Sequence, residues 1–419
     1  MKILYLCPDL GIPVLGRKGA SVHVRSLARA LVAAGHSLVV AAPLLHRSPW
    51  QAPAALDVPV WHIPPGGSIV RAAVAVREFA EGMAADASLA GEVRRILYDR
   101  ALAHRLRRRF EQEPPDAIYE RASLYATAGV AAARELGIPH LLELNAPLSL
   151  EQATYRGTGL GELASRAERW TLSRTDAVLA VSGPLRDYAI SVGVEPNRVH
   201  VLPNGVDEGL FRPAPPDEAV RRRWALDGGP ILGFVGGLRP WHGVQALPPL
   251  LARLRGRHPG VRLVVVGDGP LRPELVRSLR EAGLLDRVVL TGSLPQEEVA
   301  ALIRLFDVAL APYSKADHAF YFSPLKLFEY MACAVPPVAA ALGQIREVVR
   351  DGETGLLYAA GDDDALAEAC SRLLGDEELR RRIGKAAAQE VRGRYTWRGN
   401  AERVGQLART LQARRDAPA

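Results

Sequence analysis

Lysine is rare in this chain of 419 residues, and one of its five lysines stands in the most informative stretch of the sequence. The run Ser323-Pro324-Leu325-Lys326 is typical of a helix start, with Ser323 as the capping residue and Pro324 at the first helical position. We expect the helix to continue through Glu329 to about residue 334. Its first backbone N–H groups, the positive end of its dipole and the Lys326 charge together indicate an anion-binding site.

Glu329 follows Lys326 by three residues, so the two side chains share one helical face about a turn apart. The ligand that fits this arrangement has a phosphate group at the helix start and hydroxyl groups beside the carboxylate. The alternative is an ordinary capped helix that carries an exposed ion pair, and spacing alone leaves both open.

A first run of alternating strands and helices, residues 1–205, has the pattern of a doubly wound parallel sheet. It opens with a buried strand at 2–7, a glycine-bearing loop that ends at Gly19, and a helix at 21–34. Asn145 follows the buried strand at 140–144, and we expect it at the same rim of the sheet as the Gly19 loop. Further strands are expected at 38–42, 117–119, 177–181 and 198–202, and helices at 68–110, 125–136, 164–173 and 183–192.

A proline-rich linker at 212–216 leads to a second run, residues 206–392, of the same kind. Its strands are expected at 231–235, 262–266, 287–291, 308–311 and 336–339. Two loops at the carboxyl edge carry candidate ligand-binding residues: Gly237 and His242 after the first strand, Gly267 and Asp268 after the second. Their glycine spacing differs from the dinucleotide fingerprint, which argues against a nicotinamide cofactor. A last helix is expected at 397–411.

Composition excludes several classes of protein. A hydrophobic content of 48% and the absence of low-complexity runs describe a globular chain of two domains. The sequence has no apolar run long enough for a membrane helix and no secretory signal at its start, so we expect a cytoplasmic protein. The net charge of +7 comes mostly from arginine, and no recognition motif supports nucleic-acid binding. The three cysteines lack metal-ligand spacing.

The end of the helical stretch at 68–110 is strongly basic. Seven arginines stand there beside Ile96, Leu97, Leu102 and Leu106. Such a segment could rest on an anionic membrane at the inner face. The alternative, which we favour because arginine is the default basic residue throughout the chain, is a solvated helix face.

The order of these motifs resembles the retaining glycosyltransferases of family 4, whose GT-B architecture has two facing Rossmann-like domains. The matching stretches run nearly end to end: 19–24, 181–185, 202–207, 234–243, 266–270, 323–332 and 351–356. The resemblance implies that residues 1–205 bind the acceptor, that residues 206–392 bind the nucleotide sugar, and that the helix in residues 393–419 crosses back to the first domain. The acceptor itself, whether a glycan, a lipid-linked compound or a small molecule, stays open.

Individual positions depart from the family pattern. Glu329 matches the second glutamate of the E-x7-E motif, which binds ribose hydroxyls, whereas the first glutamate falls on Tyr321. This leaves Tyr321 or the nearby Asp317 to contact the donor sugar. The family's diphosphate-binding arginine and lysine fall on Gly237 and His242, and Asn145 replaces a sugar-binding histidine. The resemblance therefore implies catalytic roles for Lys326, Arg239, Asn145 and Glu329, and substrate binding by Gly19, Gly237, His242, Gly267, Asp268, Asp317, Tyr321, Ser323, Pro324 and Leu325.

The implied chemistry needs no metal and no cofactor beyond the donor substrate, because cationic side chains and a helix N-terminus can stabilise a leaving diphosphate. Asp362, Asp363 and Asp364 open a helix, and we interpret them as a capping cluster rather than a metal site. Two alternative functions remain: a nucleotide-sugar epimerase of the same fold, and an inactive protein that binds nucleotide sugars. Slow donor hydrolysis would favour an enzyme, and tight binding without hydrolysis would favour the inactive protein.

Overall fold

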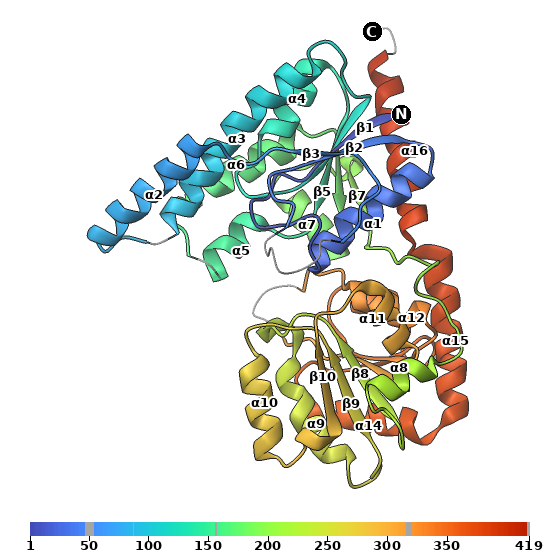
Figure 1. Cartoon of the computed structure of the whole chain (residues 1–419). Coiled ribbons are helices and arrows are strands. Elements are labelled where there is room, and N and C mark those ends of the chain that lie inside the picture. Colours follow the sequence, from blue (N-terminus) through green and yellow to red (C-terminus); the bar gives the residue numbers. More distant parts are fainter. Residues whose placement is uncertain (47–53, 87, 156, 316–319, 417–419) are drawn as a thin grey trace. The chain divides into compact units, whose positions relative to one another are not determined.

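The computed structural model describes residues 1–46, 54–86, 88–155, 157–315 and 320–416 (Figure 1). The chain divides into two compact units. The first consists of Met1–Pro203 with Asn400–Ala419, and the second of Asn204–Gly399. The sequence-based boundaries were 205/206 and 392/393. Both units are α/β structures built on parallel sheets, as the sequence predicts.

The first unit contains a seven-stranded parallel sheet with the order β3-β2-β1-β4-β5-β6-β7. Its strands are β1 (Lys2–Leu6), β2 (Ser37–Ala42), β3 (Val60–His62), β4 (Ala117–Arg121), β5 (His140–Leu144), β6 (Ala177–Ala180) and β7 (Val199–Val201). The strand order reverses between β1 and β4, which pair directly, with Leu6 opposite Glu120. In doubly wound sheets, ligands bind beside the carboxyl ends of the strands at such a reversal.

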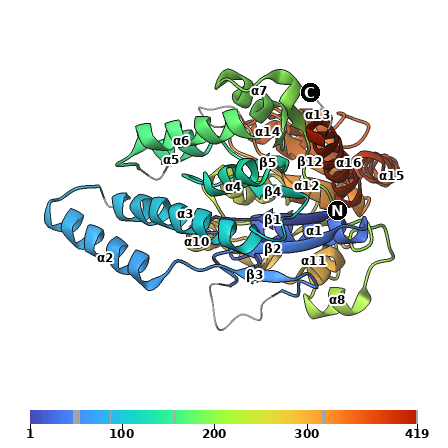
Figure 2. The same ribbon diagram turned by 90° about the horizontal axis from the view of Figure 1, so that it is seen from above.

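Helices connect these strands and cover the sheet: α1 (Gly19–Ala33), α2 (Gly67–Gly82), α3 (Leu89–Phe110), α4 (Ala128–Leu136), α5 (Leu148–Tyr155), α6 (Gly161–Arg174), α7 (Gly183–Ser191) and the short η1 (Pro196–Arg198). The continuous helix expected over 68–110 is wrong, because α2 ends at Gly82 and α3 begins at Leu89. The resulting helices α2 and α3 pack on each other and extend away from the sheet (Figure 2).

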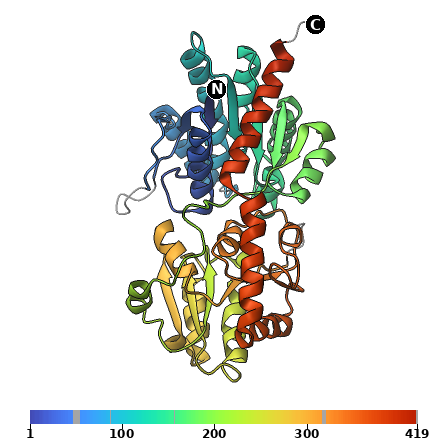
Figure 3. The same ribbon diagram turned by 90° about the vertical axis from the view of Figure 1, so that its right-hand side faces the viewer.

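The last helix, α16 (Trp397–Asp416), starts among residues of the second unit and continues in the first (Figure 3). Within the first unit it is fastened near both ends. The Asn400 side-chain amide donates to the Pro203 carbonyl oxygen at 2.7 Å, and Arg415 forms an ion pair with Asp176 at 2.8 Å. No helix among the described residues is long and apolar enough to cross a membrane.

The second unit contains a six-stranded parallel sheet with the order β10-β9-β8-β11-β12-β13. Its strands are β8 (Ile231–Val235), β9 (Arg262–Val266), β10 (Val288–Gly292), β11 (Val308–Ala311), β12 (Pro337–Ala340) and β13 (Leu356–Tyr358). Its helices are α8 (Glu218–Arg223), α9 (Leu247–Leu254), α10 (Arg272–Glu281), α11 (Gln296–Ile303), α12 (Leu325–Ala332), α13 (Ile345–Val348), α14 (Asp363–Gly375) and α15 (Glu377–Arg394), with short turns η2 (Pro240–His242), η3 (Val244–Ala246) and η4 (Leu285–Arg287).

Helix α12 is buried within the second unit. It packs against α15 and against strands β11 and β12, and every residue from Lys326 to Ala332 is buried. The aromatic side chains of Phe234, Phe328 and Tyr330 lie fully inside this core. The charged side chains of α12, Lys326 and Glu329, therefore lie in the protein interior rather than in solvent.

The acidic residues at the start of α14 act as the sequence predicts. The Asp362 carboxylate accepts the backbone N–H of Ala365 at 2.8 Å, which caps the helix, and Asp363 and Asp364 occupy its first turn. The described residues contain no group of three or more side chains arranged to hold a metal ion.

Candidate functional site

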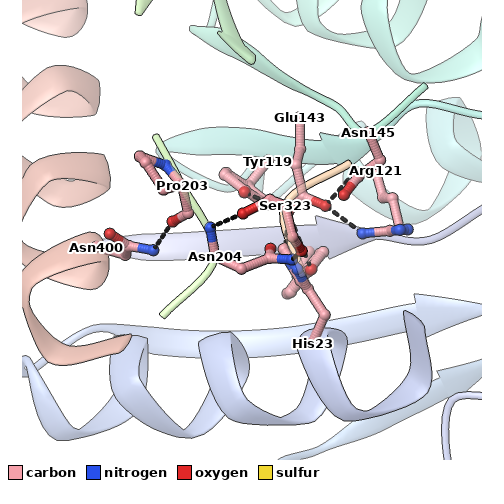
Figure 4. Close-up of polar contacts among 10 residues, drawn as sticks. His23, Tyr119, Arg121, Glu143, Asn145, Pro203, Asn204, Ser323 and Asn400 are labelled. Atoms are coloured by element: carbon pink, nitrogen blue, oxygen red, sulfur yellow. Dashed lines mark hydrogen bonds and ion pairs between the residues drawn. The ribbon is translucent and has the colours of Figure 1, made fainter. Parts of the chain in front are cut away.

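In the turn before α12, Ser323 makes different hydrogen bonds from those predicted. The backbone N–H of Asn204 donates to the Ser323 hydroxyl at 2.9 Å, and the Asn204 side-chain amide donates to the Ser323 carbonyl oxygen at 2.6 Å (Figure 4). Pro324 occupies the N-cap position, and the helix begins at Leu325. The expectation that Ser323 caps the helix is therefore wrong, because its hydroxyl serves the residue 203–207 turn instead.

Lys326 and Glu329 are buried, with only 6% and 9% of their surfaces exposed. The Nζ atom of Lys326 lies 4.1 Å from the ring centroid of Phe234 and 4.9 Å from that of Tyr313. It has no hydrogen-bond partner among the described residues. The alternative of an exposed surface ion pair is wrong, because both side chains are buried. A buried ammonium group that lacks a hydrogen-bond acceptor among the described residues indicates a position prepared for a ligand.

Burial shifts both groups toward neutrality. It lowers the pKa of Lys326 to about 7, although Glu329 opposes the shift. It raises the pKa of Glu329 to about 7, and here Lys326 opposes the shift. Desolvation therefore outweighs mutual attraction at both sites. A ligand that brings negative charge to Lys326 would restore its proton.

The loop after β8 passes directly over Lys326. Gly236 adopts a φ of +144°, and a Cβ atom at this position would lie 2.7 Å from the Lys326 Nζ atom. Only glycine adopts this backbone conformation readily. The carbonyl oxygen of Gly237 accepts a hydrogen bond from the His242 Nδ1 atom at 2.5 Å, which leaves Nε2 of that ring as an acceptor.

His242 does not supply positive charge. Burial lowers its pKa to about 3, with further lowering by the Lys326 and Arg239 charges against the opposing effect of the Gly237 hydrogen bond. Lys326 and Arg239 therefore approach the same imidazole ring. Arg239 itself is exposed, with its guanidinium group 5.7 Å from the Trp241 ring centroid. The loop thus contributes one exposed cation, Arg239, beside the buried Lys326 of α12.

The loop after β9 braces the loop after β8. The backbone N–H of Leu238 donates to the Asp268 carbonyl oxygen at 3.0 Å, and a Cβ atom on Gly267 would lie 2.0 Å from the Gly236 carbonyl oxygen. The Asp268 carboxylate accepts the N–H of Gly269 at 2.8 Å. Gly267 packs against the Gly236 backbone and Asp268 accepts from Leu238, so both contact the loop after β8; that they bind substrate stays a prediction.

The remaining predicted residues of this unit lie before α12. Tyr321 is buried, with its ring 4.5 Å from that of Phe322, and Leu325 is half-buried in the first turn. Asp317, the alternative to Tyr321 as a sugar contact, lies outside the described residues.

The predicted residues of the first unit lie at the carboxyl rim of its sheet. Gly19 is the first residue of α1, and Asn145 follows β5. The Asn145 side-chain amide donates to the carboxylate of Glu143 at 2.5 Å. Glu143 also binds His23, at 2.7 Å, and the side chains of Tyr119 and Arg121 (Figure 4). We refer to Glu143 with these four partners as the Glu143 cluster.

Electrostatics keep Glu143 ionised. Burial by itself would raise its pKa, but the His23 and Arg121 charges and the hydrogen bonds from His23 and Tyr119 hold the pKa well below its usual range. Of the five residues of this cluster, only Asn145 was predicted from the sequence as a site residue. The signal that could have found it is the presence of charged residues, Arg121 and Glu143 among them, in two buried parallel strands, because a buried charge requires a partner.

Comparison with known proteins gives consistent matches over both units. Residues 17–210 match the model described as Glycosyltransferase Family 4, and residues 217–390 match the model described as Glycosyl transferases group 1. The alpha-maltose-1-phosphate synthase of Mycolicibacterium smegmatis is 32% identical over 68% of this chain and 76% of its own length. The GDP-mannose-dependent alpha-mannosyltransferase of that organism is 34% identical over 68% of this chain and 70% of its own.

Solved structures agree on the fold. The sucrose-phosphate synthase from Thermosynechococcus elongatus matches 99% of this chain and 100% of its own, with a TM-score of 0.75 at 21% identity. The GT-B class of two Rossmann-like units, expected from the sequence, is therefore confirmed.

Proposed function

Because this chain belongs to the family 4 glycosyltransferases, a family of GT-B fold, we propose that it transfers a sugar from a nucleoside-diphosphate sugar to an acceptor hydroxyl with retention of the anomeric configuration and without a metal ion. That the chain is a glycosyltransferase follows from its family. The stereochemistry, the metal independence and the role of each residue are the proposal.

The observation that carries the proposal is the buried ammonium of Lys326 beneath the Gly236 backbone, without a hydrogen-bond partner among the described residues. In a sugar transfer of this kind, the glycosidic bond breaks as negative charge gathers on the departing diphosphate. A cation that is already desolvated and fixed stabilises that charge strongly, since no solvent has to reorganise. Lys326 therefore takes the place that a divalent metal ion occupies in other transferases.

We assign Glu329 to the ribose of the donor. Its carboxylate lies one helical turn behind Lys326, and in its ionised state it accepts hydrogen bonds from hydroxyl groups. Arg239, exposed on the loop after β8, is assigned to the outer phosphate, where it supplements the Lys326 charge. Tyr321 and Asp317 remain the two candidates for contact with the donor sugar.

In the first unit, we assign Asn145 to a sugar or acceptor hydroxyl. Its amide nitrogen donates to Glu143, so its Oδ1 atom is left to accept a hydrogen bond from a ligand. The Glu143 cluster thereby fixes which end of the amide the ligand meets.

We propose an acceptor presented in solution rather than at a membrane. Of the four large apolar residues that could have anchored the basic helix, Leu102 and Leu106 belong to the core of the first unit and Ile96 packs against a smaller buried cluster. Only Leu97 is exposed, at 37%. The arginines of α3 thus lie on a helix whose apolar face is directed inward.

The test is donor turnover in the presence of EDTA. Purified protein is incubated with UDP- and GDP-sugars, and release of the nucleoside diphosphate is followed with and without the chelator. Release that is unaffected by EDTA supports the proposal. Release that is abolished by EDTA and restored by Mg²⁺ contradicts metal independence, and tight donor binding with no release supports the inactive nucleotide-sugar-binding protein. The anomeric proton of the product, observed by NMR, decides between retention and inversion.

A further inference from the structure

A groove of about 620 Å³ lies within the first unit, between the edge strand β7 and the helix α16. Its walls come from β6, α7, the turn before β7, β7 itself and α16. We refer to it as the α16 groove. The residues that line it include Arg186, Val199, His200, Val201, Arg403 and Leu407. The groove contains none of the residues assigned above to donor or acceptor, and the donor-binding residues belong to the other unit.

The charged side chains that line the groove are two arginines, Arg186 and Arg403, and no carboxylate of the described residues lines it. His200 also lines it, but burial lowers the pKa of this imidazole and favours its neutral form. Neither the Arg186 nor the Arg403 guanidinium group forms an ion pair or a hydrogen bond within the described part of the chain. Two other surface arginines of the unit are paired, Arg107 with Glu135 and Arg415 with Asp176. Arg186 and Arg403 therefore remain available to an external anion.

The strand edge adds free backbone groups. Leu202 donates its N–H to the Ala180 carbonyl oxygen at 2.8 Å, so the backbone groups of residues 200 and 202 face β6. Residues along a strand alternate in this respect, and the backbone groups of Val201 therefore face the open side of β7, which is the edge of the sheet. Leu179, Val199 and Leu407 supply apolar surface beside them.

We propose that the α16 groove binds a small organic anion, with its anionic group held by Arg186 and Arg403 and its apolar body against Val199 and Leu407. The volume lies in the range of about 300–1,000 Å³ that is usual for small-molecule sites. A β7 of three residues offers too short an edge for an added peptide strand, which favours a small molecule. The ligand is a phosphorylated or carboxylated compound that is distinct from the donor.

Such a ligand would connect α16 to the sheet. The groove walls on α16 extend from Arg403 to Thr410, between the Asn400 and Arg415 contacts that fasten the helix. A bound anion adds a third attachment between these two. If it binds the folded unit alone, it raises the free energy of unfolding of that unit by RT ln(1 + L/Kd), where L is the ligand concentration, and the unfolding temperature rises with L.

The test uses the full chain and the dye 8-anilinonaphthalene-1-sulfonate, an anion with an aromatic body, followed by its fluorescence. We expect saturable binding of one dye per chain. The double variant Arg186→Ala, Arg403→Ala should weaken it at least tenfold, and Thr410→Trp, which fills the groove, should do the same. Arg414→Ala is the matched control, since Arg414 is exposed on the same helix outside the groove, and it should bind the dye as the unchanged protein does.

Competition then identifies the ligand class. Displacement by fructose 1,6-bisphosphate indicates a phosphorylated ligand, and displacement by citrate indicates a carboxylate. The proposal is overturned if the double variant binds the dye with unchanged affinity, or if neither small anion displaces it. Displacement by UDP or GDP would place the dye at the donor site and would also overturn it, whereas a chain without transferase activity that still passes these tests would leave it intact.

Discussion

The Nζ atom of Lys326 lies over the ring of Phe234, 4.1 Å from its centroid, in the interior of the second unit. The aromatic face attracts the cation but does not replace a hydrogen-bond acceptor. The buried ammonium group of Lys326 therefore lowers the stability of the second unit, and a bound diphosphate would supply the hydrogen-bond acceptors that it lacks among the described residues.

Replacement of Lys326 with alanine should lower kcat by about 100-fold or more, the usual loss when one preorganised electrostatic contact is removed. Lys385→Ala, which removes an exposed lysine from the same unit, is the control and should leave turnover unchanged. Nucleoside-diphosphate release with a saturating donor measures both. Full turnover in the Lys326 variant would show that another group stabilises the leaving diphosphate.

Donor binding should take up protons at mildly alkaline pH. Burial lowers the pKa of Lys326 to about 7, so at pH 8 the unliganded side chain is mostly neutral, and a bound diphosphate should draw about one proton onto it. Calorimetric titration with UDP or GDP in buffers of different ionisation enthalpy measures the uptake. Lys326→Met should abolish it. Equal binding enthalpies in all buffers would contradict the lowered pKa.

Gly236→Ala should impair catalysis with little change in fold. The new Cβ atom would lie 2.7 Å from the Lys326 Nζ atom and require a φ of +144°, so the lysine or the loop must move. A displacement of about 1 Å can cost on the order of 100-fold in rate. Gly256→Ala is the matched control, because nothing lies within 4 Å of its Cβ position. Wild-type kcat/KM in Gly236→Ala would show that the loop adapts freely.

Glu143→Gln should destabilise the first unit by about 3–5 kcal/mol, because it leaves the buried Arg121 without its counter-charge. Glu135→Gln, which breaks the exposed pair with Arg107, should cost about 0–1 kcal/mol. The folded-state pKa of Glu143 is depressed, so its stabilisation is complete above its ordinary pKa of 4.5 and is lost as pH falls toward the folded value. Thermal unfolding between pH 7 and pH 3 should therefore separate wild type from Glu143→Gln most at pH 7.

The protein should not sediment with anionic liposomes at moderate salt, since α3 directs Leu102 and Leu106 into the core. Any attraction from its arginines is electrostatic and falls off over about 8 Å at physiological ionic strength. Co-sedimentation at low and at physiological salt measures this. Binding that persists at physiological salt would contradict the choice of an acceptor in solution.

The strands that were predicted with the observed bounds include apolar strands that lie in the interior of a sheet. Residues 231–235 and 308–311 form short apolar runs, as expected for strands covered by helices on either side. Strands β3 and β13 were missed; each has only three residues and lies at a sheet edge. Strand β7 is equally short and also lies at an edge, but it was predicted at 198–202.

The positions of side chains were harder to predict. Local preference favoured Ser323 as a cap, but the hydroxyl is engaged by Asn204, which lies 119 residues earlier in the chain. The Glu143 cluster draws its members from α1, β4, β5 and the residue after β5, so no local spacing shows it. Lys326 was recognised by its type and its place in the helix, while its burial and its lack of a hydrogen-bond partner became visible only in three dimensions.

The first unit is completed by residues that follow the whole of the second unit in the chain. During synthesis on a ribosome, the second unit is therefore complete before the first. The edge strand β7 remains uncovered by α16 until residues 400–416 have been synthesised. An uncovered strand edge is a site of mispairing between nascent chains. Removal of α16 should thus reduce the yield of folded protein in the cell more than it weakens protein already folded, which makes this helix a determinant of assembly order as well as of structure.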